Sequence, residues 1–181
     1  LRTSHHDSRT QLIYRQSELG PGGTITALGL EVLAIPGQTM NDWTVRMKHT
    51  PWTGFPGAAW EGSGWTTVYQ SDETITSWGW ASFEFSTPFE YNGVDNLMID
   101  FSFNNSSSSA DGEVMTTNYP GSIRSVYYYT DSEYGDPLTW SETSGPTPYS
   151  DDLLPNIKLV MEDRVAITPT QSGNFADGVW T

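Results

Sequence analysis

Two tryptophans lie one residue apart in the segment WGWASFEF, near the middle of the chain. Strict alternation of side chains along a strand places Trp78 and Trp80 on the face opposite Phe83. Two aromatic rings on the open side of a sheet form a flat apolar platform, on which the C–H faces of a sugar can stack. A bulge at Gly79, or a loop over both rings, would bury them instead, as is usual for tryptophan. The pattern predicts a sugar-binding face, with burial of the two rings as the alternative.

Basic side chains share one face of another predicted strand, which alternates from Asn41 to His49. Arg46 and Lys48 point away from the predicted core in a chain that has only 8 Lys and Arg residues. If this strand lies beside the tryptophan platform, the two bases would pair with a carboxylated or sulfated glycan. The alternative is that both neutralise nearby carboxylates of the protein itself.

Two further tryptophans, Trp52 and Trp60, occur in a loop from Thr50 to Gly64 that is rich in Pro and Gly. Large rings on loops either fix the loop by packing or contact a ligand. We therefore include both in the predicted ligand-binding set. Glu84 joins the set because alternation places it on the same face as Trp80.

Acidic residues crowd the long loop that follows a Tyr-rich segment. Asp131, Glu133 and Asp136 would supply carboxylate oxygens of the kind that Ca²⁺ prefers, without Cys or His. The spacing of an EF-hand loop is absent, and a solvated acidic loop is the alternative. A structural calcium ion is the one cofactor that the sequence suggests, and none is required.

Hydrolysis of a glycoside needs two carboxylates that face each other across a cleft. Glu84 with a second carboxylate would form such a pair, which keeps a small β-sandwich glycosidase as an alternative. No G-x-S-x-G elbow, P-loop, zinc-hydrolase spacing or Rossmann glycine motif occurs in the sequence. The sequence therefore predicts a protein that is not an enzyme.

The charge balance argues against two kinds of partner. The chain has 8 Lys and Arg against 22 Asp and Glu, a formal net charge of −14, so nucleic acid and anionic bilayers would repel it. No apolar run is long enough to insert into a membrane. The lack of Cys, together with few Lys and many Thr, Ser, Asn and Trp residues, favours an exported bacterial protein, secreted or on the cell surface.

The elements that must position these residues are short alternating segments separated by Gly, Pro and Asn turns. They predict an all-β protein without helices, a two-sheet antiparallel β-sandwich of the jelly-roll type. With 181 residues the chain suffices for one such core. We expect a flexible arm at residues 1–9 and the sandwich module at residues 10–164.

Two segments, SELGPGGTI and TPFEYNGVDNL, resemble parts of a jelly-roll accessory module found in multidomain secreted and cell-surface bacterial proteins. The matching positions are Glu18, Leu19, Gly20, Gly23, Ile25, Thr87, Pro88, Phe89, Tyr91, Gly93, Asn96 and Leu97. These residue types form turns and core, so the resemblance implies an accessory or adhesin-like module and transfers no catalytic residue. The tail at residues 165–181 resembles the opening of an immunoglobulin-like module, which implies a linker or the start of a following module.

Taken together, these features predict a non-catalytic carbohydrate-binding module. It would tether a secreted multidomain bacterial protein to a polysaccharide or oligosaccharide, with neighbouring modules of the same polypeptide as its other partners. A structural or adhesin-like spacer module without a glycan site is the main alternative, and burial of Trp78 and Trp80 would favour it.

Overall fold

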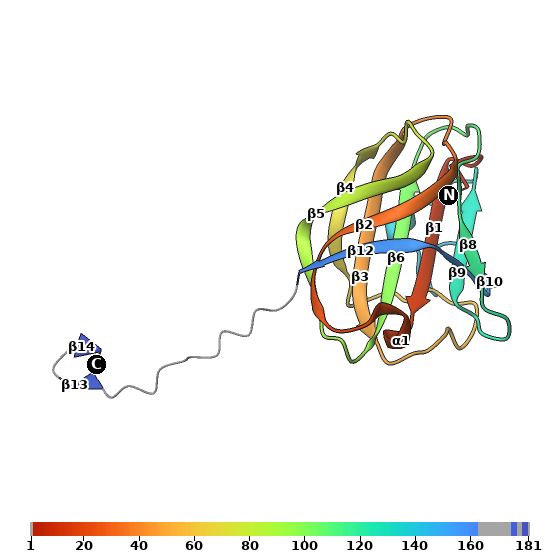
Figure 1. The fold of residues 1–181 in the computed structure, drawn as a ribbon. Helices are drawn as coiled ribbons and strands as arrows, with labels where there is room; N and C mark the ends of the chain where they lie inside the picture. Colours follow the sequence, from red (N-terminus) through yellow and green to blue (C-terminus); the bar gives the residue numbers. More distant parts are fainter. Residues whose placement is uncertain (1, 163–174, 177–178, 181) are drawn as a thin grey trace.

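A computed structural model describes residues 2–162, 175–176 and 179–180. Over these residues the protein is all-β: two main antiparallel sheets face each other, and two further pairs of short strands lie outside them. Figure 1 shows the strands of the smaller sheet running across those of the larger sheet. The predicted antiparallel sandwich is therefore confirmed, whereas its jelly-roll connectivity stays a prediction.

The larger sheet has six strands. In spatial order they are β10 (Tyr149–Asp151), β9 (Ser125–Thr130), β1 (Asp7–Tyr14), β6 (Asn96–Asn104), β3 (Met40–Thr50) and β4 (Thr66–Glu73). The smaller sheet consists of β12 (Ile157–Glu162), β2 (Gly23–Ala34) and β5 (Gly79–Tyr91), and β7 (Glu113–Val114) pairs with β2.

The remaining elements are short. β8 (Thr116–Asn118) pairs with β11 (Leu153–Pro155), and β13 (Phe175–Ala176) pairs with β14 (Val179–Trp180). The helical elements are α1 (Gln16–Leu19) and the 3₁₀ turn η1 (Pro137–Thr139). Among the described residues, no helix has the length and apolar character needed to cross a membrane.

The core lies between the two sheets and follows the predicted alternation. In β3 the inward side chains of Trp43, Val45 and Met47 are buried. The Trp43 ring stacks on Phe101 of the same sheet at 5.5 Å between centroids and contacts Phe83 of the opposite sheet at 5.7 Å. Aromatic pairs of this kind add to the free energy gained by burying their area, so Trp43 helps to join the two layers.

The outer face of the larger sheet is also covered. Two loops, residues 51–65 and 131–148, carry apolar side chains onto it. The resulting second cluster contains Ile13, Phe55, Trp60, Met98, Val126 and Trp140. Strands β1 and β6 are consequently buried on both faces, as their burial patterns show. The polar residues of these strands must therefore find partners within the protein.

The N-terminal arm predicted for residues 1–9 is wrong where the structure describes it. Strand β1 begins at Asp7 and lies between β6 and β9. Thr3 is fully buried and Arg9 is 1% exposed. The prediction failed because the segment is polar and has no apolar period, while it is held by pairing partners distant in sequence. The predicted linker at residues 165–181 lies outside the described residues except for the short β13–β14 pair.

Candidate functional site

The outer face of the smaller sheet carries the tryptophan platform. Trp80 lies near the start of β5, opposite Glu31 of β2, and is 42% exposed. Its neighbours on the same face of β5, Ser82 and Glu84, are exposed as well. A Cβ atom at Gly29 would lie 3.4 Å from the Trp80 ring, an ordinary van der Waals distance, which shows that the indole lies against β2 at this position.

Trp78 directly precedes β5 and is 76% exposed. The chain turns at Gly79, whose φ of +89° lies in the left-handed region that favours glycine. Neither ring is covered by a loop, and Phe83 on the opposite face is buried. The predicted alternation is confirmed from Trp80 to Phe85, whereas Trp78 lies before the strand, beyond the turn at Gly79. Both rings are open to solvent.

One cation lies on this platform. The Nζ atom of Lys158 is 4.0 Å from the centroid of the Trp80 ring. Lys158 belongs to β12 and pairs with Gly29, which separates it from β5 by one strand. The ammonium group is therefore held by the negative face of the indole.

The structure does not bring Arg46 and Lys48 to Trp78 or Trp80; both cations lie 5.4 Å from the ring centroid of Trp65 instead. Both lie in β3 on the outer face of the larger sheet, so the core separates them from Trp80. Arg46 donates to Oδ2 of Asp100 at 2.5 Å, and Lys48 lies 3.2 Å from a carboxylate oxygen of Glu61. Both cations pair with carboxylates of the protein, which is the alternative that the sequence left open.

Trp60 is also placed for packing. It is 4% exposed, its indole N–H donates to the carbonyl oxygen of Pro146 at 2.8 Å, and its ring contacts Trp140 at 5.9 Å. Trp52 is 39% exposed and lines a shallow hollow of about 360 Å³ with Phe55, Glu61 and other loop residues. Of the loop tryptophans in the predicted set, only Trp52 is accessible to a ligand.

The acidic loop does not form a metal centre. Asp131 accepts a hydrogen bond from the backbone N–H of His6 at 3.1 Å, and Asp136 accepts from the N–H of Leu138 at 2.9 Å. Glu133 is exposed. Within the described part of the chain, no group of three or more His, Asp or Glu side chains is arranged to hold a metal ion. The calcium prediction gains no support from this geometry.

Glu84 lies on an open sheet face, opposite Ala27 of β2. Hydrolysis by two carboxylates requires that both line a cleft, so the position of Glu84 does not favour the glycosidase alternative.

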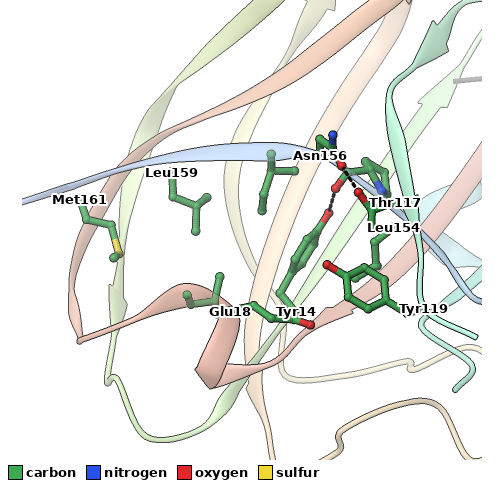
Figure 2. A pocket seen from close by; sticks show the side chains of 11 residues that line it. Tyr14, Glu18, Thr117, Tyr119, Leu154, Asn156, Leu159 and Met161 are labelled. Atoms are coloured by element: carbon green, nitrogen blue, oxygen red, sulfur yellow. Dashed lines mark hydrogen bonds between the residues drawn. The ribbon is translucent and has the colours of Figure 1, made fainter.

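A pocket of about 350 Å³ opens at one edge of the sandwich. Figure 2 shows Leu159 and Met161 pointing from β12 towards the side of the pocket formed by Glu18 and Tyr14. Several of its polar groups already have partners. The Tyr14 hydroxyl donates to the carbonyl oxygen of Pro155 at 2.6 Å, and Thr117 donates to Asn156 at 2.7 Å.

The carboxylate of Glu18 in this pocket is held by Arg124, a side chain with no exposure. The two N–H groups of Arg124 donate to its oxygens at 3.1 and 2.5 Å. Burial acts to raise the pKa of Glu18, but the hydrogen bonds from Arg124 and from the Arg15 backbone outweigh it and lower that pKa. The charged and hydroxyl groups of Glu18, Tyr14 and Thr117 are thus already paired within the protein, which makes the pocket a weaker candidate site than the Trp80 face.

A cluster that sequence reasoning missed lies on the outer face of the larger sheet. Asp100 has no exposed side-chain surface and accepts hydrogen bonds from Arg9, Gln11 and Arg46. The available signal was an acidic residue in the middle of the apolar strand NLMIDFSF, because a buried carboxylate requires cationic or N–H partners.

The fold and the Trp80 face define the protein as an all-β sandwich with an open aromatic platform. No family model, no curated protein and no solved structure matches the chain.

Proposed function

We propose that the protein is a non-catalytic carbohydrate-binding module of a secreted, multidomain bacterial protein. The observation that carries the proposal is the exposure of Trp80, at 42%, on the outer face of the smaller sheet, with Trp78, at 76%, directly before the same strand. A soluble protein gains nothing in its own core from such rings, whereas a pyranose can stack its C–H face on them. The flat face desolvates only part of a sugar, so the affinity should be modest.

The test is binding of the whole chain to a panel of insoluble and soluble polysaccharides. Trp80→Ala and Trp78→Ala should each weaken binding by about tenfold, since one stacked aromatic ring contributes about 1 kcal/mol or more. Tyr149→Ala is the matched control, because Tyr149 is 54% exposed but lies on the edge strand β10 of the other sheet. The Tyr149→Ala variant should bind the polysaccharides as tightly as the unaltered protein.

The alternative is a structural or adhesin-like spacer module without a glycan site. It would be favoured if no glycan in the panel binds, or if the two tryptophan variants bind as well as the unaltered chain. Release of reducing sugars, abolished by Glu84→Gln, would instead favour the glycosidase.

A further inference from the structure

We infer that the Trp80 face selects polysaccharides with free amino groups, such as polymers of glucosamine, whose ammonium group takes the place of Lys158 over the indole. This inference rests on the proposed function and names the glycan class. Its starting point is the ammonium group that already lies 4.0 Å from the ring centroid of Trp80.

The contact shows that the ring and its surroundings accommodate a cation. Lys158 is an exposed residue on the edge strand β12, and a long flexible side chain of this kind can leave the ring without disturbing the sheet. A ligand ammonium would then recover the cation–π interaction that Lys158 gives up. A neutral sugar must displace Lys158 without recovering that interaction.

The charged residues around the Trp80 ring also favour a cationic ligand. The strands of the smaller sheet, with β7, contain one basic residue, Lys158, among their residues. Their acidic residues are Glu31, Glu84, Glu90, Glu113 and Glu162. Glu31 is directly opposite Trp80 in register, and Glu84 follows on the same face of β5. Such a face attracts cationic ligands and repels uronic or sulfated glycans.

The experiment compares three probes on the whole chain: a soluble glucosamine oligomer, the same oligomer fully N-acetylated, and a polyuronate. The amino form should bind about three- to tenfold more tightly than the acetylated form, which has the same ring but no charge. The polyuronate should bind more weakly than either.

Three variants separate the site from general charge attraction. Trp80→Ala should abolish the preference for the amino form, and Glu31→Gln should reduce it. Lys158→Met should tighten binding of the amino form, because the internal competitor is gone. Glu142→Gln is the charge-matched control, since Glu142 is an exposed carboxylate in the loop over the other sheet, and it should leave the preference unchanged. A circular dichroism spectrum of each variant checks that it is folded.

The outcomes distinguish this inference from the proposed function. Equal, Trp80-dependent binding of the two oligomers would overturn the inference and leave the carbohydrate-binding proposal standing. Equal losses in Glu31→Gln and Glu142→Gln, with none in Trp80→Ala, would show general attraction to an acidic protein and would also overturn it. Binding of none of the probes, and of no other glycan in the panel, would overturn both.

Discussion

Arg9 and Asp100 form a buried, hydrogen-bonded ion pair in the middle of the larger sheet. The Nε and NH2 atoms of Arg9 donate to Oδ2 of Asp100 at 3.1 and 2.8 Å, and the two side chains are 1% and 0% exposed. The third nitrogen of Arg9 donates to the carbonyl oxygens of Pro137 and Trp140. One arginine thus joins two neighbouring strands to the loop that covers them.

Asp100→Asn should strongly destabilise the fold. The substitution keeps the size of the side chain but leaves Arg9 and Arg46 without a counter-charge in a site that excludes water. We expect a loss of about 3–5 kcal/mol in the free energy of unfolding, as for other buried pairs that lose one partner. Urea denaturation measures this loss of stability as a lower midpoint concentration of urea.

Glu61→Gln is the control for this prediction. It removes the partner of Lys48 in a pair whose side chains are 16% and 23% exposed, so its cost should stay below about 1 kcal/mol. Similar midpoints for the two variants would show that the buried network does not hold the sheet together.

Trp60→Ala should affect stability and leave glycan binding intact. Trp60 is buried between the sheet and the covering loop, with the guanidinium of Arg9 4.9 Å from its ring centroid. Loss of a ring packed in this way costs about 3–5 kcal/mol. Thermal unfolding and binding to the polysaccharide panel, measured on the same sample below its melting temperature, would separate the two effects. Weaker binding by the folded variant would mean that Trp60 belongs to the ligand site.

Strand alternation predicted the core strands correctly because the period of two depends only on residues that are neighbours in the sequence. In β3 from Trp43 to Met47, in β5 from Ala81 to Phe85 and in β6 from Leu97 to Phe103, every second side chain is apolar and packs in the core between the sheets. Trp80 could be placed on the open face for the same reason. A period of two residues is visible in one sequence, and it fixes the face of each side chain once the inward face is known.

The partners of Arg9, Arg46 and Lys48 could not be predicted in this way. Arg9 meets Asp100, which lies 91 positions away in the chain, and the loops that cover β3 have no period of their own. A side chain that points away from the core can therefore be buried by a distant loop. Lys158 over Trp80 is a similar case, since the order of strands β12, β2 and β5 decides the contact.

Glu18→Gln should destabilise the protein at neutral pH but not in acid. Glu18 is ionised against Arg124, and its pKa is lowered from the ordinary value of 4.5. A lowered pKa in the folded state means that the pair stabilises the fold above pH 4.5 and that this contribution is lost as the pH falls through the folded pKa. At pH 7 we expect a cost of about 1 kcal/mol, because the buried Arg124 loses its counter-charge.

Unfolding curves of both proteins across this pH range test the prediction. The difference between them should shrink steadily as the solution becomes more acidic. A difference that does not change with pH would mean that Glu18 acts through packing alone.

Asp7→Asn should stabilise the protein at neutral pH, whereas Glu18→Gln destabilises it. Burial is the main cause that raises the pKa of Asp7 from 3.8 to about 6, against the attraction of His6, 3.4 Å away. One carboxylate oxygen of Asp7, Oδ1, is buried without a hydrogen-bond partner in the structure. Because the folded pKa is above the unfolded one, ionisation of Asp7 opposes folding. Its penalty is absent below pH 3.8, grows as the pH rises, and is complete above about pH 6.

The asparagine variant mimics the protonated acid and should escape this penalty. Its melting temperature should match that of the unaltered protein below pH 3.8 and exceed it at pH 7, by an amount equivalent to about 1 kcal/mol after allowance for solvent screening. Glu133→Gln is the control, since Glu133 is exposed in the loop at residues 131–148, and its melting temperature should match that of the unaltered protein at both pH values. A less stable Asp7→Asn protein at pH 7 would show that the attraction to His6, rather than burial, dominates at this position.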